Sequence, residues 1–164
     1  MRIQMKIQGS FLNHVKNDLR RPHEYAYERI GFIFVNKAII NGEDTMLLPS
    51  YYMTIPDDQY IPDSKVGARY NADAIRSVMQ RVFDTGEGAI HVHEHSPMFP
   101  AFSRDDIENQ KRLIPTFRNV GLKSIHGAIL LTGEIIAGLC WLPNENNPRK
   151  IAQIKVIERP LITY

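Results

Sequence analysis

The feature that most constrains the fold is a predicted strand followed closely by a predicted helix, both carrying polar side chains that can bind a metal. His93 and His95 end the segment from Ala89 to His95, in which apolar and polar residues alternate as they do in a strand. Ser103 and Asp106 follow a loop that contains two prolines, and their spacing places both on one face of a helix's first turn. The chain is therefore expected to bring a strand end and a helix start together.

The size and charge of the chain predict one domain without a nucleic-acid partner. Its 164 residues, 43% of them hydrophobic, suffice for one sizeable core but not for two ordinary domains, so we expect a single domain over residues 1–164. The 20 basic and 18 acidic side chains are mixed along the sequence and form no basic patch. The single cysteine, Cys140, lies in an apolar run and is expected to be a core thiol, and the lack of an internal disulfide favours the cytoplasm.

Neither residues 1–8 nor the stretch from Ala128 to Leu142 has the pattern of a signal peptide or a membrane span. Residues 1–8 alternate between apolar and polar side chains, which predicts a half-buried strand and not the core of a signal peptide. The stretch from Ala128 to Leu142 is interrupted at Thr132-Gly133-Glu134, which predicts two short buried strands and a tight turn. We therefore expect a cytoplasmic protein without a membrane partner.

The periodicity along the chain predicts an α/β protein of the α+β type, with a mixed, largely antiparallel sheet and about three helices. The helices are expected to begin at Ser10, Asn71 and Ser103, and Pro115 should break or kink the third near Ile114. A long loop is expected from Met53 to Tyr70. The predicted strands cover residues 1–8, 30–40, 45–52, 89–95, 122–131, 134–142 and 150–157.

The polar residues at the strand end and helix start suit a hydrolytic zinc site. Such a site needs three protein ligands and an open position, where the ion lowers the pKa of water to about 7. His93, His95 and Asp106 can supply the three ligands. A carboxylate outside this set must then take up the proton, and Glu28, at the start of a buried strand, is the candidate, with Glu24 as the alternative.

This arrangement resembles the JAMM (JAB/MPN) metalloprotease family, whose signature is a glutamate followed later by His-x-His-x7-Ser-x-x-Asp. The matching residues are Glu28, His93, His95, Ser103 and Asp106, and Gly31 completes the Glu-x-x-Gly strand start. The resemblance covers roughly residues 1–157 and implies a JAB/MPN-like fold with one Zn²⁺ per chain. It also implies that Glu28 is the acid/base and that Ser103 donates a hydrogen bond to the tetrahedral oxyanion.

The resemblance further implies cleavage of the isopeptide or peptide bond after the C-terminus of ubiquitin or a ubiquitin-like protein. In size the chain is similar to the compact bacterial JAB proteins of ubiquitin-like antiviral operons. The expected partners are then the tail of a ubiquitin-like protein, its conjugates, and the activating and conjugating enzymes of the operon. Precursor maturation and deconjugation both stay open as the main role. Two other functions also stay open: processing of a sulfur-carrier protein, or release of cysteine from it, and a non-catalytic MPN-type scaffold.

Several residues of the segment have alternative interpretations. His91 creates a second His-x-His pair, so a three-histidine site stays open, although a role beside the ligands is preferred. Ser103 and Asp106 also have the pattern of a capping box. The sequence departs from many family members in having Ser96 and not proline after His95, and in the bulky acidic Glu94 between the histidines. His126, on a later strand, is expected to be a half-buried histidine with a hydrogen-bond partner.

Overall fold

The computed structural model describes residues 1–24, 26–63 and 67–158. Within these residues the chain forms a single α+β domain around an eight-stranded mixed sheet in the order β7-β6-β5-β4-β2-β3-β1-β8, which confirms the predicted fold class. The helices are α1 (Gly9–Leu19), α2 (Ala72–Thr85) and α3 (Arg104–Arg118), with a short 3₁₀ helix at Asp57–Gln59. The strands are β1 (Ile3–Gln8), β2 (Ile30–Ile40), β3 (Asp44–Thr54), β4 (Gly88–Glu94), β5 (His126–Thr132), β6 (Ile135–Trp141), β7 (Arg149–Lys150) and β8 (Gln153–Ile157).

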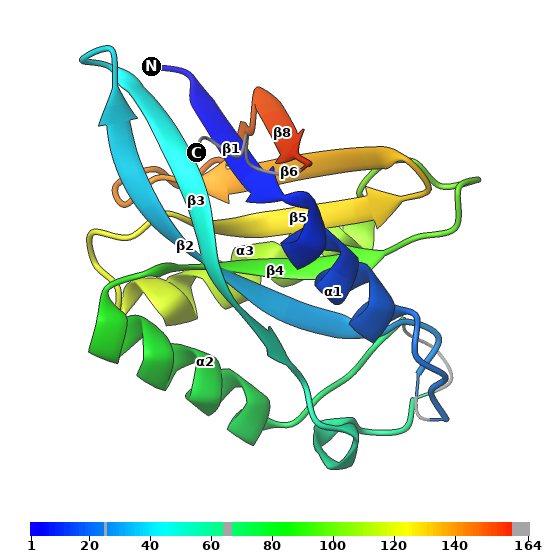
Figure 1. The fold of residues 1–164 in the computed structure, drawn as a ribbon. Helices are drawn as coiled ribbons and strands as arrows, with labels where there is room; N and C mark the ends of the chain where they lie inside the picture. Colours follow the sequence, from blue (N-terminus) through cyan, green and yellow to red (C-terminus); the bar gives the residue numbers. More distant parts are fainter. Residues whose placement is uncertain (25, 64–66, 159–164) are drawn as a thin grey trace, which may run out of the picture.

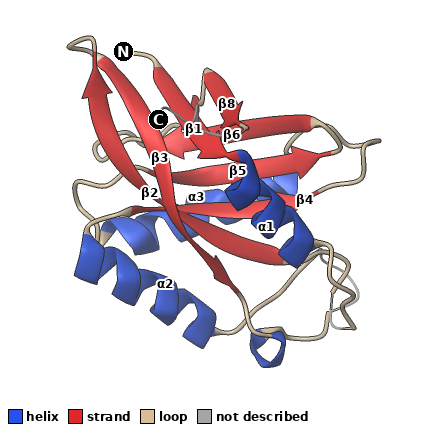
Figure 2. Cartoon of the chain, in the orientation of Figure 1, coloured by secondary structure: helices blue, strands red, loops and turns tan. Residues whose placement is uncertain are grey.

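Helices cover both faces of the central strands (Figures 1 and 2). Helix α1 packs on one face, where Leu12 and Val15 join Ile33 of β2 in a buried apolar cluster. Helices α2 and α3 lie on the opposite face, where Val78 and Phe117 pack with residues of β2. Strand β4 lies between antiparallel β2 and parallel β5. Its two faces are therefore both covered, and only its end reaches the surface.

The two edge strands of the sheet are consecutive in the chain. Residues 150–157 were expected to form one strand, but β7 pairs with β6 and β8 pairs with β1. The chain crosses between these edges at Ile151 and Ala152, whose N–H groups donate to Gly138 at 2.9 Å and to Ile3 at 2.8 Å. The sheet is strongly curled as a result. The prediction of one continuous strand over residues 150–157 was wrong, because local periodicity does not specify which strand a segment pairs with.

Some predicted boundaries also differ from the structure. Helix α1 follows Gln8 and has no side-chain cap, so Ser10 is not its N-cap. Helix α3 continues through Pro115 to Arg118, because the burial of Ile114 and Phe117 holds the last turn against the core. Asn71 is confirmed as the N-cap of α2, where its side chain accepts hydrogen bonds from two backbone N–H groups.

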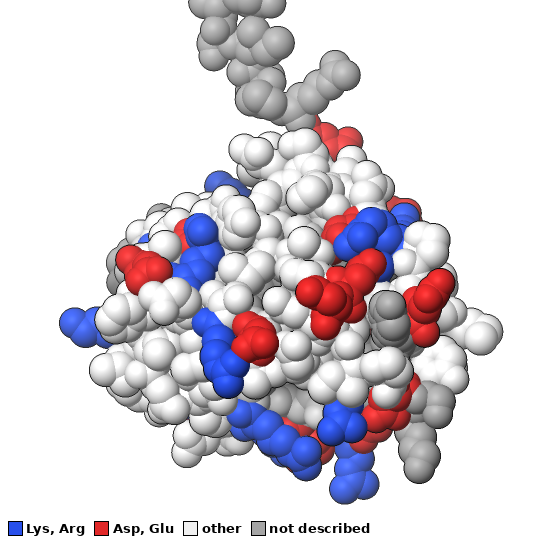
Figure 3. All heavy atoms as spheres, turned by 90° about the horizontal axis from the view of Figure 1, so that it is seen from below, with Lys and Arg blue, Asp and Glu red and all other residues white. Residues whose placement is uncertain are grey.

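The surface of the protein carries charges of both signs, and its cysteine is buried. On the face seen in Figure 3, acidic and basic side chains are interspersed and form no broad patch of one sign. None of the helices in the described part of the chain has the length and apolar character needed to cross a membrane. Cys140 is buried, and burial raises the pKa of its thiol to about 12. The thiol is therefore protonated at neutral pH, as expected for a core residue.

Candidate metal centre

Strand β4 delivers the predicted histidine ligands to the side of the sheet that faces α3. Ile90 and Val92 point into the cluster beneath α1, so the alternation of the strand turns His91 and His93 to the opposite face. His95 lies just past the end of β4, but its N–H still donates to the carbonyl oxygen of Leu131 at 2.8 Å. This bond continues the strand pairing and keeps the second histidine in register with the first.

The start of α3 fixes the carboxylate of Asp106. The Ser103 hydroxyl oxygen accepts a hydrogen bond from the Asp106 N–H at 3.1 Å, and Asp106 Oδ2 accepts from the Ser103 N–H at 2.7 Å. The Ser103 hydroxyl also donates to the same carboxylate oxygen at 2.7 Å. The capping box considered from the sequence is therefore present, and it holds the carboxylate against the histidines.

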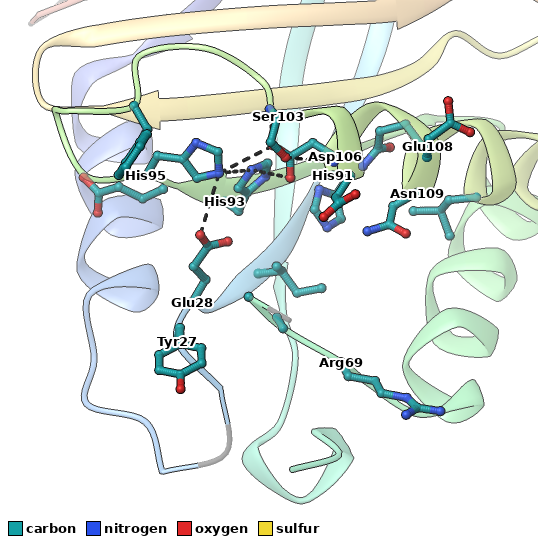
Figure 4. A pocket seen from close by; sticks show the side chains of 18 of the residues that line it. Tyr27, Glu28, Arg69, His91, His93, His95, Ser103, Asp106, Glu108 and Asn109 are labelled. Carbon is teal, nitrogen blue, oxygen red and sulfur yellow. Dashed lines mark hydrogen bonds and ion pairs between the residues drawn. The ribbon is translucent and has the colours of Figure 1, made fainter. Parts of the chain in front are cut away.

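The two histidines and Asp106 converge on one point (Figure 4). The Nε2 atoms of His93 and His95 are 3.1 Å apart. The carboxylate of Asp106 places Oδ1 at 3.3 Å from His93 Nε2 and Oδ2 at 3.5 Å from His95 Nε2. Tetrahedral ligands at about 2.0 Å from a zinc ion are themselves about 3.3 Å apart. The distance between the two histidines thus fits one edge of a tetrahedral site, and each histidine has one oxygen of the Asp106 carboxylate at a similar separation.

Glu28 reaches the same point from the segment before β2. Its Oε1 lies 3.7 Å from His95 Nε2, and one ligand atom from each of Glu28, His93 and His95 lies within 4.8 Å of the others. These three residues form a group that could hold a metal ion. Glu24, the alternative considered from the sequence, does not belong to this group. The structure therefore gathers Glu28, His93 and His95 into one group, and Asp106 lies outside that group but places a carboxylate oxygen against each histidine.

The charge state of Asp106 suits a ligand. Burial alone would raise the pKa of this carboxyl, but hydrogen bonds with His93 and Ser103 outweigh that effect and hold the pKa well below its usual range. The carboxylate is therefore ionised at neutral pH. A metal ligand must be in this form, because the lone pairs of the deprotonated oxygens bind the cation.

His91 lies beside the group but is not a member of it. Its ring packs edge-on against Phe32, with ring centres 5.5 Å apart, and lies 5.3 Å from the ring of His93. Burial lowers the pKa of His91 to about 3, which leaves the ring neutral. Among the described residues, the buried Nδ1 atoms of His91, His93 and His95 have no hydrogen-bond partner. The contacts within the candidate site are made by the Nε2 atoms of His93 and His95.

Glu94 and Ser96, the two positions at which the sequence departs from many members of the family that it resembles, make contacts with distant segments. Glu94 accepts three hydrogen bonds from the guanidinium of Arg20, two from Nε at 2.8 and 3.2 Å and one from Nη2 at 2.6 Å. This ion pair joins the end of α1 to the strand between the histidines. The carbonyl oxygen of Ser96 accepts a hydrogen bond from the Thr132 hydroxyl at 3.2 Å. Both contacts hold the exit of β4 in place.

Gly31 has a role that the sequence did not reveal. A Cβ at this position would lie 2.2 Å from the hydroxyl oxygen of Tyr52, so the glycine makes room for the tyrosine ring. The Tyr52 hydroxyl donates to Asp18 Oδ2 of α1 at 2.7 Å. The close approach at Gly31 is thus made by a side chain of β3, which ties the start of β2 to α1.

A pocket of about 1290 Å³ opens beside the candidate metal group. Its walls come from the segment 67–70, the loop between β4 and α3, and the exposed side of α3. Met98 and Phe99 of that loop and Tyr27 beside Glu28 are largely exposed at 78%, 62% and 78%. The pocket therefore combines a polar centre with an apolar rim.

His126 confirms the prediction of a histidine with a hydrogen-bond partner, but it is fully buried and not half-buried. Its Nδ1 accepts the N–H of Ala89 at 3.1 Å. The ring supports β4 from the neighbouring strand and does not belong to the metal group.

Comparison with known proteins gives little further information. No family model matches the chain, and no curated protein matches it. Among solved structures, the N-terminal domain of STIL from Trichoplax adhaerens matches 82% of this chain with 9% sequence identity and a TM-score of 0.41. The chain spans only 39% of the length of that structure. This likeness is too low to support an inference about function.

Proposed function

We propose that the chain is a zinc-dependent hydrolase of the JAMM type, which cleaves the isopeptide or peptide bond after the C-terminus of a ubiquitin-like protein. The observation that carries the proposal is the group formed by Glu28, His93 and His95, with the carboxylate of Asp106 against both histidines and Ser103 bonded to Asp106. These residues come from three separate segments of the chain. Their types and spacing match the family signature, and a purely structural role does not require that combination.

His93, His95 and Asp106 would hold the ion. Imidazole nitrogen and carboxylate oxygen are ligands that zinc accepts. Asp106 is preferred to Glu28 as the third ligand because its oxygens approach both histidines, at 3.3 and 3.5 Å, whereas Glu28 pairs with His95 at 3.7 Å. A bound zinc ion would polarise the scissile carbonyl and lower the pKa of a water molecule.

Glu28 would move the proton. Its side chain is 30% exposed, so the carboxylate faces both the metal group and the pocket. From this place it can accept a proton from the attacking water and pass it to the leaving amine. Because Glu28 is not one of the proposed ligands, its carboxylate oxygens stay available to bind and release the proton.

Ser103 would stabilise the oxyanion. Its hydroxyl donates to Asp106 in the absence of substrate, and a hydroxyl can rotate to a different acceptor. As negative charge develops on the substrate oxygen, a donor at this edge of the group would lower the barrier. The backbone bonds of the capping box would keep α3 in place during that change.

The pocket would hold the extended tail of the ubiquitin-like protein. Its apolar rim, formed by Tyr27, Met98 and Phe99, suits the side chains of a flexible peptide. In this proposal the partners are the ubiquitin-like protein, its conjugates and the enzymes that make them, and the reaction takes place in the cytoplasm. The rival scaffold function does not require the convergence of a base with three ligands.

The proposal is tested by mass spectrometry of a ubiquitin-like precursor that carries a C-terminal extension. Incubation with the zinc-loaded chain should release the extension at one bond, and a metal chelator should stop the release. The Glu28→Gln variant serves as the matched control, because it keeps the proposed ligands. If the zinc-loaded chain leaves both precursors and isopeptide conjugates intact, the proposed function is wrong.

A further inference from the structure

Gly67 lies directly against the proposed acid/base, although the two are far apart in the sequence. The N–H of Glu28 donates to the carbonyl oxygen of Gly67 at 2.9 Å. A Cβ added at Gly67 would lie 2.8 Å from Glu28 Oε2 and 3.0 Å from Glu28 Cδ. Non-bonded heavy atoms rarely approach one another this closely, so such a Cβ would clash with the side chain of Glu28. The carboxylate of Glu28 thus occupies the space that any larger residue at position 67 would fill.

We propose that Gly67 is a positioning residue for Glu28. Its carbonyl oxygen fixes the backbone of Glu28, and its missing side chain leaves the place from which the carboxylate faces His95. The inference rests on the proposed function, in which that carboxylate is the acid/base. It adds a residue that touches neither the ion nor the reacting atoms.

The surroundings of Gly67 indicate which group would move if a methyl were added. Segment 67–71 is held by backbone hydrogen bonds: the Ile61 N–H donates to Arg69 at 2.8 Å, and the Asn71 N–H donates to Gln59 at 2.8 Å. Gly67 is not among the glycines with positive φ, so alanine meets no backbone strain there. The Glu28 carboxylate is the end of a flexible side chain. An added methyl would therefore displace the carboxylate and leave the fold intact.

Displacement of the carboxylate would slow the reaction without removing the ligands. Glu28 Oε1 lies 3.7 Å from His95 Nε2, so a shift of about 1 Å changes its alignment with the reacting atoms substantially. A misplacement of that size costs on the order of 10²-fold in rate. The three atoms nearest to a Cβ at Gly67 all belong to Glu28, so the methyl would act on Glu28 first and metal binding by His93, His95 and Asp106 should persist.

The test compares Gly67→Ala with Gly9→Ala. A Cβ at Gly9 would meet only atoms at 3.3 Å or more, the nearest on the flexible side chain of Glu158. For Gly67→Ala we expect kcat to fall about 10²-fold with KM little changed and one zinc ion retained, while Gly9→Ala behaves as the parent chain. In the Glu28→Gln background, Gly67→Ala should cause no further loss, because the group that it displaces is already inactive.

A crystal structure of Gly67→Ala gives a readout that does not depend on activity. We expect the distance between Glu28 Oε1 and His95 Nε2 to lengthen beyond the 3.7 Å of the parent chain. An unchanged distance, an unchanged kcat in an active parent, or an equal loss in the Glu28→Gln background would overturn the inference. If the parent chain has no hydrolytic activity, the proposed function fails, and the crystal structure alone decides whether Gly67 positions Glu28.

Discussion

The Nε2 atoms of His93 and His95 lie 3.1 Å apart, because one intervening residue turns both rings to the same side of β4 and its extension. Two imidazole nitrogens at this distance can share at most one proton between them, whereas a divalent cation can accept a lone pair from each. The ion would also offset the negative charge that Glu28 and Asp106 bring to the same point.

Substitution of either histidine should abolish metal binding. We expect His93→Ala and His95→Ala to lose the zinc that the parent chain retains after gel filtration, because two protein ligands hold zinc far less tightly than three. Metal content is measured by inductively coupled plasma mass spectrometry. His14→Ala, which lies in α1 and packs on Tyr52, is the control and should keep the metal. Full zinc content in both histidine variants would contradict the assigned ligands.

Glu28→Gln should separate proton transfer from metal binding. The amide keeps the shape of the side chain but cannot accept the proton, so kcat should fall by about 10²- to 10⁴-fold while one zinc ion remains bound. Steady-state kinetics measure kcat, and metal analysis of the same sample measures the bound zinc. Full turnover in this variant would refute the assigned base, and loss of zinc would make Glu28 a ligand.

His91→Ala should keep the zinc stoichiometry. His91 is not a member of the metal group but packs against Phe32, so its loss should lower the free energy of unfolding by roughly 1–3 kcal/mol. Chemical denaturation and metal analysis measure the two effects separately. A variant that folds but has lost its zinc would instead favour a site with three histidines.

Ser103 should contribute to stability and to turnover independently. Ser103→Ala removes the N-cap of α3, which costs about 0.5–2 kcal/mol, and the proposed oxyanion donor, which costs about 10²- to 10³-fold in kcat. Ser103→Asn is the comparison, because asparagine is also a good N-cap but has no hydroxyl. It should restore the stability and leave turnover low. Recovery of both would mean that Ser103 acts only as a cap.

His126 should make the stability depend on pH. Burial lowers the pKa of His126 to about 4 from an ordinary value of 6.5, so between these values the unfolded chain binds more protons than the folded one. Stability is therefore full above about pH 6.5 and falls as the pH drops toward 4, by on the order of 3 kcal/mol. Urea unfolding of the metal-free chain at pH 7.5 and 4.5 measures this, and His126→Gln should show a smaller difference. An identical pH dependence in the variant would exclude His126 as the source.

Local patterns were sufficient to predict the elements that carry the candidate site. The strand alternation before His95 and the capping pattern of Ser103 each depend on neighbouring residues, and the structure contains both elements. Pro115 is an exception, because its local preference is overridden by the burial of Ile114 and Phe117 in the same helix. Local rules thus predict best where no tertiary contact opposes them.

Contacts between distant segments had no signal in the sequence. The Arg20–Glu94 ion pair joins the end of α1 to β4, and neither residue is marked by its neighbours. Gly67 lies in a loop that was expected to be irregular, and its approach to Glu28 depends on how that loop folds back. The crossing at Ile151 likewise depends on which sheet edges are free. These contacts follow from the assembled fold and not from local propensity.

The most direct test of the metal site is anomalous diffraction at the zinc edge from a crystal grown with zinc. The account predicts one strong peak within bonding distance of His93 Nε2, His95 Nε2 and Asp106, with the carboxylate of Glu28 facing it. The absence of a peak at this point, or a peak with Glu28 turned away from it, would contradict the account.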